Sequence, residues 1–232
     1  MRLDRFLAET TELTRSLAKR ALQRGEVSVN GVKIKQAATQ VVPTDRVEWQ
    51  GQRLELVGLR YVMLHKPVDV ECSARRGLYP RAVDLIDLPK PERLQVVGRL
   101  DVDTTGLVLL TDDGQWSHRI TSPRRRCPKV YHATLADPLT GEALTEAVER
   151  FAEGILLEGE EKPTLPAELA MQDSHTAELT IHEGRYHQVK RMFAALGNRV
   201  VALHRHSVGP LELGGLKQGQ WRELGDEEIT AF

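Results

Sequence analysis

A short polar stretch directly before a strongly apolar one holds the side chains best suited to chemistry. Residues 98–106 contain two carboxylates, Asp101 and Asp103, and two threonine hydroxyls. The apolar run 107–110 follows and ends in a turn-like sequence at 111–114, so it predicts a buried strand. Loops held by rigid strands commonly carry catalytic groups. Spacing alone leaves a plain polar turn open, because Asp and Thr are ordinary turn residues.

The elements that must hold this stretch can be read from the apolar spacing around it. Short alternating or continuous apolar runs predict strands, and helical spacing predicts helices. They alternate without a regular strand–helix–strand repeat, which predicts an α+β domain with a mixed, mainly antiparallel β-sheet flanked by helices. The predicted strands are 61–64, 94–97, 107–110, 129–135, 177–181 and 200–203; the predicted helices are 116–120, 140–155 with Leu144, Val148 and Phe151 inward, and 187–196 with Val189, Met192, Phe193 and Leu196 inward.

The N-terminal part of the chain predicts two short amphipathic helices, over 2–8 and 14–22. Gly25 stands where a helix commonly ends in a left-handed residue. The basic side chains of the second helix lie mostly opposite its apolar side, at a spacing suited to successive phosphates. Its inward residues are Leu17, Ala21 and Leu22, its cap is Thr14 or Ser16, and its basic residues are Arg15, Lys19 and Arg20.

A β-hairpin follows these helices. Residues 27–29 and 32–34 alternate as strands around Asn30-Gly31, a strong signal for a two-residue turn. The segments 50–52 and 57–60 look like the exit from this module, so we expect a domain boundary near residue 58.

Charge is distributed unevenly along the chain. The formal net charge is −1, which alone argues against a nucleic-acid partner. Residues 1–60, however, carry a net charge of +4 and the remainder −5. Two segments of the remainder, 119–129 and 185–206, contain five basic residues each and no acidic one. Local basic patches, rather than the total, predict where phosphates bind.

Composition excludes several classes of protein. The 232 residues are 41% hydrophobic, which suits a globular protein with a substantial core. There is no long uncharged apolar run and no signal-peptide segment after Met1, so we expect no membrane partner and a cytoplasmic location. Cys72 and Cys127 are too few for a disulfide framework or a metal site of their own. We expect a reduced protein without a metal, and a monomer.

Two separated segments resemble the pseudouridine synthases that modify ribosomal RNA. Gly98-Arg99-Leu100-Asp101 with Thr104-Thr105-Gly106-Leu107 is similar to the signature loop of that family, and the similarity continues over 111–123 and returns over 183–193. The resemblance implies that Asp101 is the catalytic carboxylate. It implies that Tyr131, which lies in a Lys-x-Tyr sequence, contacts the target base, and that Leu100 lines the same pocket. It also implies that Lys190, in Gln188-Val189-Lys190, is the cationic partner of Asp101.

Some positions leave alternatives or depart from the family pattern. Asp103 is the rival carboxylate, although it matches a variable family position, and Arg191 is the rival cation. His65 stands where asparagine is usual and Asp69 where glycine is usual, which puts the local turn in doubt and not the chemistry. His65 has no second metal ligand at suitable spacing nearby.

The N-terminal module resembles the αL RNA-binding motif first known from a ribosomal protein of the small subunit, over about residues 1–48; a plain α+β cap is the alternative. The resemblance implies an RNA-binding domain over 1–58 followed by a catalytic domain over 59–232. Residues expected to contact RNA are Arg15, Lys19, Arg20, Arg99, Arg124, Arg125, Arg185 and Arg191.

Together these resemblances imply an isomerase that converts one uridine of 16S rRNA, expected to be uridine 516, into pseudouridine without a cofactor. The target base would be flipped into the pocket, and the substrate would be an assembly intermediate of the small ribosomal subunit. The alternatives are the same reaction on 23S rRNA and a non-catalytic ribosome-assembly factor that binds RNA.

Overall fold

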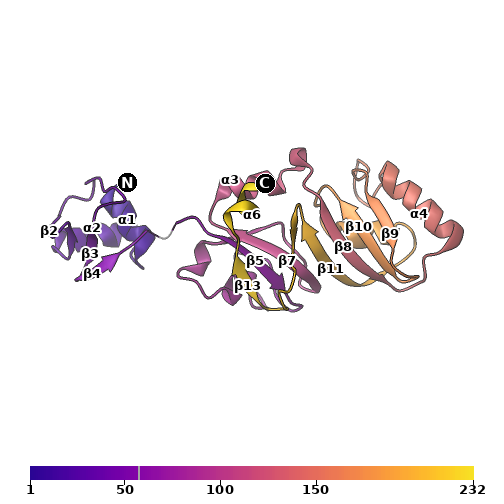
Figure 1. Cartoon of the computed structure of the whole chain (residues 1–232), viewed down its shortest axis with the longest axis horizontal. Helices are drawn as coiled ribbons and strands as arrows, with labels where there is room; N and C mark the ends of the chain where they lie inside the picture. Colours follow the sequence, from indigo (N-terminus) through magenta and orange to yellow (C-terminus); the bar gives the residue numbers. More distant parts are fainter. Residues whose placement is uncertain (57) are drawn as a thin grey trace. The chain divides into compact units, whose positions relative to one another are not determined.

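The computed structural model describes residues 1–56 and 58–232. Val57, which the sequence placed in the exit from the N-terminal module, lies outside the described residues. The chain divides into two compact units, Met1–Gly58 and Leu59–Phe232, which Figure 1 colours from indigo to yellow along the sequence. Each unit has its own hydrophobic core and is described by itself.

The first unit begins with helices α1 (Leu3–Thr10) and α2 (Arg15–Gln23). The hydroxyl of Thr14 accepts a hydrogen bond from the backbone N–H of Leu17 and so caps α2. One predicted inward position is wrong: Leu17 is 43% exposed, whereas Ala18 is fully buried. The buried side of α2 is therefore made by Ala18, Ala21 and Leu22.

Four short strands complete the first unit, in the order β2-β1-β3-β4 within the described residues. Asn30 and Gly31 both have positive φ, as a two-residue hairpin turn requires. Gln50 and Gly51 repeat this geometry, so the segment predicted as the module's exit is instead the turn of a second hairpin. The strands are β1 (Val27–Val29), β2 (Val32–Lys33), β3 (Val47–Trp49) and β4 (Gln52–Leu54).

The second unit is built on one mixed sheet with the order β13-β5-β7-β11-β8-β10-β9, as far as the described residues show; β6 pairs with β7 and β12 with β11. Figure 1 shows these strands side by side, with α4 beyond β9 and with α3 and α6 together at another part of the unit. Among the described strands of this sheet, every pairing is antiparallel except that between β7 and β11, which confirms the predicted fold class. The strands are β5 (Tyr61–Lys66), β6 (Gln95–Val97), β7 (Thr104–Thr111), β8 (Lys129–Leu135), β9 (Glu168–Met171), β10 (Thr176–Ile181), β11 (Val200–Val208), β12 (Leu211–Glu212) and β13 (Trp221–Glu223).

Alternation along the strands divides the core between the two faces of this sheet. On β7, Val108 and Leu110 join one cluster, while Leu107 and Leu109 join the other around Trp116. This is the period-two pattern expected of a sheet that is covered on both sides. Four helices and three 3₁₀ turns are present in the described part of this unit: η1 (Ala82–Leu85), η2 (Pro91–Arg93), α3 (Gly114–Thr121), η3 (Pro123–Arg125), α4 (Gly141–Glu153), α5 (Gln188–Ala194) and α6 (Asp226–Thr230).

Three predicted features of this unit need correction. Val148 of α4 is 37% exposed, and Ala147 is buried with Phe151 instead. The strand predicted over 200–203 continues to Val208 and is not the last, because β12, β13 and α6 follow it. Thr104 begins strand β7 rather than lying in the loop before it. None of the helices in the described residues is long and apolar enough to cross a membrane.

The parallel pairing of β7 with β11 brings two backbones unusually close. Gly106 lies opposite Arg205 and has φ of 118°, a value that side-chain-bearing residues rarely adopt. A Cβ atom at Gly106 would lie 2.2 Å from the carbonyl oxygen of Arg205. Glycine is therefore required at this position for the two strands to pair.

We predict that Gly106→Ala destabilises the second unit by about 2 kcal/mol or more, because the added methyl group meets backbone that cannot move without breaking the pairing. Urea unfolding measures this loss. Gly114→Ala is the matched control, since a Cβ there meets nothing within 4 Å and alanine favours the start of α3. Equal midpoints for the two variants would contradict the prediction.

Candidate active site

Asp101 lies on the loop between β6 and β7, and hydrogen bonds from several segments fix that loop. The carbonyl of Asp101 accepts the N–H of Thr104 at 3.1 Å, and the carbonyl of Val102 accepts the N–H of Asp69 at 2.9 Å. The ammonium group of Lys66, fully buried, donates to the carbonyls of Pro67, Val70 and, at 3.4 Å, Val102. Its burial lowers the pKa of Lys66. These contacts hold the loop at the end of the central strand.

Lys190, from α5, joins the two carboxylates that the sequence left as rivals. Its Nζ lies 3.0 Å from Oδ2 of Asp101 and 2.7 Å from Oδ1 of Asp103. Burial opposes the charge on Lys190, but its hydrogen bonds to Asp103 and Asp101 outweigh burial and raise the pKa of Lys190. The hydrogen bond from Lys190 lowers the pKa of Asp103. Asp103 is 67% exposed and Asp101 30%, so Asp101 is the more enclosed carboxylate.

His187 contacts the other oxygen of Asp101, a role that the sequence analysis did not assign. Its Nε2 lies 3.2 Å from Oδ1 of Asp101. His187 has φ of 46° and ψ of 37° at the start of α5, a left-handed conformation that a non-glycine residue seldom adopts outside functional sites or turns. The Glu183-Gly184 sequence before it marked a turn but gave no sign that this histidine would face Asp101.

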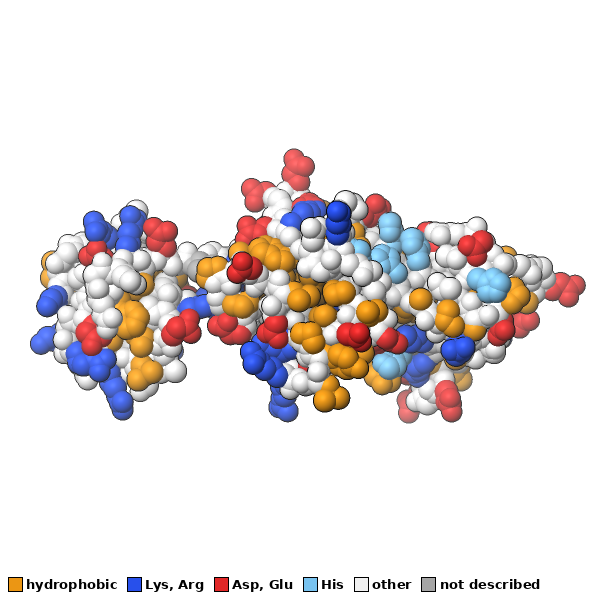
Figure 2. All heavy atoms as spheres, turned by 90° about the horizontal axis from the view of Figure 1, so that it is seen from below, with side chains coloured by type: hydrophobic (Ala, Val, Ile, Leu, Met, Phe, Trp, Pro, Cys, Tyr) orange, Lys and Arg blue, Asp and Glu red, His pale blue; other side chains and the backbone are white. Residues whose placement is uncertain are grey.

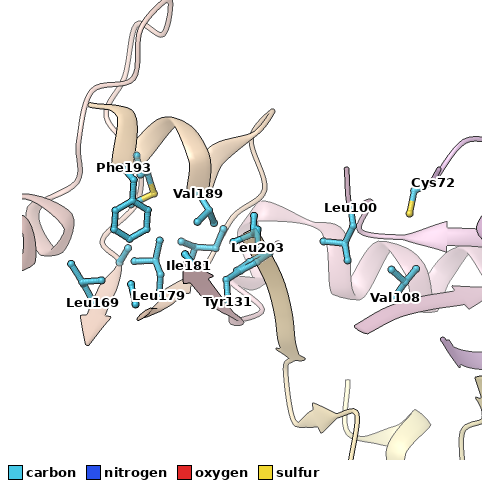
Figure 3. Close-up of a cluster of buried hydrophobic side chains, with 14 of the residues drawn as sticks. Cys72, Leu100, Val108, Tyr131, Leu169, Leu179, Ile181, Val189, Phe193 and Leu203 are labelled. Atoms are coloured by element: carbon cyan, nitrogen blue, oxygen red, sulfur yellow. The ribbon is translucent and has the colours of Figure 1, made fainter. Parts of the chain in front are cut away.

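A small pocket adjoins Asp101 and is partly lined by apolar side chains. Leu100 forms part of its lining, together with Tyr131 and Leu203, and the pocket has a volume of about 60 Å³. Figure 3 shows Tyr131 beside Leu203 and Ile181, with Leu100 across from them. The residue Thr104 also lines this pocket, and its hydroxyl has no hydrogen-bond partner among the described residues. The pocket therefore combines apolar walls with the charged and polar side chains around Asp101.

Arg205 fixes the tyrosine of this pocket, and the sequence analysis missed it because the predicted strand stopped at 203. The side chain is 1% exposed. Its guanidinium donates to the carbonyls of Leu107 at 2.8 Å and Gly98 at 2.7 Å, and to the hydroxyl of Tyr131 at 3.4 Å. If the predicted strand had been extended to residue 205, an arginine at an inward-facing strand position would have been the signal.

A wider cleft opens over the carboxylates, with a volume of about 910 Å³. Arg99 and Asp101 line it, and so do Leu78, Tyr79 and Tyr186. The cleft shares Asp101, Lys190 and His187 with the small pocket. The two spaces therefore meet at Asp101.

Two of the arginines expected to contact RNA also make several hydrogen bonds within the protein. Arg185 donates to the carbonyls of Lys162 and Pro163 and to Glu183. Arg191 donates to Glu160 at 3.0 Å, to the carbonyl of Glu158 and to that of Tyr186. These contacts tie the 158–163 segment to the start of α5, and RNA contact by either arginine stays a prediction. Arg191 does not contact Asp101 in the structure, whereas Lys190 does.

The other predicted RNA contacts lie on exposed surface. Arg99 is exposed and lines the cleft, whereas Arg124 and Arg125 are exposed on η3 and do not line it. In the first unit all three basic residues of α2, namely Arg15, Lys19 and Arg20, are exposed. Figure 2 shows Lys and Arg side chains spread over the visible surface of that unit.

The two departures from the family pattern have structural accounts. Asp69 has φ of 60°, which explains why glycine suits this turn. The ring Nδ1 of His65 lies 2.8 Å from the carbonyl of Leu216, on the loop before β13. No group of metal-ligating side chains suited to hold an ion occurs in the described part of the chain.

Comparisons with known proteins agree with this geometry. Residues 60–195 match the family model of RNA pseudouridylate synthases, and residues 1–47 match that of the S4 domain. The chain is 52% identical to the ribosomal small subunit pseudouridine synthase A of Pasteurella multocida and 48% identical to that of Vibrio cholerae, each over 100% of this chain and 99% of the relative. A crystal structure of a pseudouridylate synthase, 48% identical, superposes with a TM-score of 0.70 and covers 100% of this chain and 99% of that one.

The match of the catalytic unit to the family model and the full-length identity to curated relatives settle the classification. The chain belongs to the RNA pseudouridylate synthases, a family of isomerases, and carries an S4 domain before its catalytic sheet.

Proposed function

We propose that this chain isomerises a uridine of 16S rRNA to pseudouridine, with uridine 516 as the target. The observation that carries the proposal is the carboxylate of Asp101, which lies between Lys190 and His187 at the junction of a small pocket and a wide cleft. The names of the most similar relatives support RNA of the small ribosomal subunit, rather than of the large one, for the substrate.

The reaction needs no redox partner. The bond from C1′ of the ribose to N1 of uracil breaks, the base turns, and C1′ bonds to C5. C5 loses its proton and N1 gains one, so atoms and electrons balance. Asp101 acts in its ionised form, as a nucleophile or as a base that removes a sugar proton. Lys190 supports that form by charge and hydrogen bond, because an opposite charge stabilises a partly buried carboxylate.

The base must leave its stack to reach Asp101, at a cost of a few kcal/mol. Leu100 and the ring of Tyr131 offer apolar surface on which uracil could rest, and the Thr104 hydroxyl is available to a polar atom of its edge. Arg205 fixes the position of Tyr131 before the base arrives. We infer that the pocket is preorganised, with little rearrangement needed around Tyr131.

We further propose that the S4 unit binds rRNA through α2, and that the substrate is an assembly intermediate of the small ribosomal subunit, in the cytoplasm. The exposed basic side chains of α2 support the first part. An extended rRNA contact would place the second unit near its target uridine.

The direct test is to map pseudouridine after incubating the purified chain with 16S rRNA, 23S rRNA and assembly particles of the small subunit. Chemical labelling and reverse transcription locate the modified base. We expect one site, in 16S rRNA. Pseudouridine in 23S rRNA alone would show that the target lies in the large subunit. Binding of RNA without pseudouridine formation would favour a non-catalytic assembly factor.

We predict that Asp101→Asn abolishes pseudouridine formation but changes the RNA dissociation constant only a few-fold, since the amide keeps the shape of the side chain and loses its charge. Single-turnover rates and filter binding measure the two quantities. Asp103→Asn is the matched control and should retain activity. An active Asp101→Asn with an inactive Asp103→Asn would show that Asp103 is the reactive carboxylate.

We predict that Lys190→Met lowers the single-turnover rate at neutral pH by about tenfold or more, because the variant removes the ammonium group that donates a hydrogen bond to Asp101. Lys190→Arg should keep much of the activity, and Lys217→Met, at an exposed lysine, should behave as the parent. An unchanged single-turnover rate for Lys190→Met would exclude the pairing of Lys190 with Asp101 as a requirement for catalysis.

The same network predicts a window of stability. The raised pKa of Lys190 makes its contribution complete below about pH 10 and lost above, and the lowered pKa of Asp103 makes its contribution complete above about pH 4 and lost below. The stability difference between parent and Lys190→Met, measured by urea unfolding, should therefore be greatest between these limits. A difference that grows outside them would contradict this assignment.

We predict that the chain beginning at Leu59 folds but binds rRNA more weakly and with a shallower dependence on salt. The second unit contains its own cores, and loss of the first unit removes phosphate contacts whose number sets the salt slope. Dissociation constants across a salt series, with circular dichroism as the folding control, measure this. An unchanged slope would argue against RNA binding by the S4 unit.

A further inference from the structure

Tyr186 presents a flat aromatic surface immediately beside the reactive carboxylate. Its side chain is 76% exposed, which is unusual for an aromatic ring with no solvent-facing role. One face of the ring is stacked on His187, with centroids 3.8 Å apart and planes 18° apart. His187 in turn contacts Asp101. A base that stacks on the open face of Tyr186 would extend the Tyr186–His187 stack. That stack ends at His187, the side chain that contacts Asp101.

The backbone that carries this ring is held firmly. The carbonyl of Tyr186 accepts a hydrogen bond from Nη1 of Arg191 at 3.0 Å, and the same guanidinium is paired with Glu160. His187 has the left-handed conformation described above, so the Tyr186–His187 pair sits on a fixed turn. A preorganised aromatic surface loses less entropy when it binds a flat partner.

The surroundings fit a nucleic-acid strand. Tyr186 lines the cleft together with Lys190 and Arg99. The same cleft is lined by Leu78, 97% exposed, and Tyr79, 40% exposed. Figure 2 shows hydrophobic side chains next to charged ones on the visible face of the second unit. Aromatic surfaces interleaved with cations are typical of sites where unstacked bases bind.

We propose that Tyr186 is a stacking platform for the base of a nucleotide adjacent to the target uridine. The inference rests on the proposed function and adds a second RNA subsite to it. When the target uridine turns into the pocket at Asp101, its neighbour loses a stacking partner. The ring of Tyr186 supplies a replacement and offsets part of the cost of flipping.

The test is a double-mutant cycle between the protein and the RNA. The RNA is a 16S rRNA fragment centred on the uridine that the parent modifies, prepared intact and with an abasic nucleotide at the preceding or the following position. The proteins are the full chain, Tyr186→Ala, Tyr186→Trp and the control Val148→Ala, an exposed apolar residue of α4. Dissociation constants and single-turnover rates are measured for each combination, with thermal unfolding to check the fold.

We expect Tyr186→Ala to weaken binding of the intact fragment by about tenfold, Tyr186→Trp to retain the parent affinity, and Val148→Ala to have no effect. An abasic nucleotide at one of the two positions should weaken parent binding by a similar factor and abolish the effect of Tyr186→Ala. If the parent is active but Tyr186→Ala weakens binding of the intact fragment and of both abasic fragments by the same factor, Tyr186 is not a stacking platform. A parent that forms no pseudouridine in any rRNA overturns the proposed function itself.

Discussion

The buried guanidinium of Arg205 connects three parts of the catalytic unit. A charge removed from water must have its donors satisfied, and this one reaches carbonyls before and within β7 and the hydroxyl of Tyr131 on β8. The segment that carries Asp101, the central strand and Tyr131 are thereby fixed to one side chain of β11. Residue 106, opposite Arg205, must be glycine because β7 and β11 lie so close together there that no Cβ atom fits. The loop that carries Asp101 is therefore positioned by the same contacts that hold the strands together.

The sequence predicted the parts of this arrangement that repeat at a regular period or match a family motif. A continuous apolar run was sufficient to predict β7, and short apolar patterns were sufficient for β8 and β10. The motifs brought Asp101 and Lys190 into one hypothesis, which the 3.0 Å contact supports. Short strands such as β12 and β13 carry too few residues for a periodic signal. The roles of His187 and Arg205 depend on distances across the sheet that no local pattern contains.

Charge was the least reliable guide to the site. A run of basic residues over 185–206 suggested phosphate contacts, yet Arg185, Arg191 and Arg205 donate to carbonyls and carboxylates of the protein. A basic residue close to a predicted turn has carbonyl oxygens within reach, and those partners are invisible in a count of charges. Of the basic residues that the sequence singled out, Arg99 is the one that is both exposed and in the cleft, and the three on α2 of the other unit are also exposed.

The parallel pairing of β7 with β11 sets when the site can exist during synthesis. These strands meet through residues 99 positions apart, as the contact between Thr105 and His204 shows, and Lys190 follows Asp101 by 89 positions. Loop closure of that length must precede the contacts that stabilise it, so such pairing forms slowly. The N-terminal unit, complete by Gly58, can fold on a growing chain long before this happens. A nascent chain that ends before β11 could thus hold RNA through its first unit while it still lacks an assembled catalytic centre.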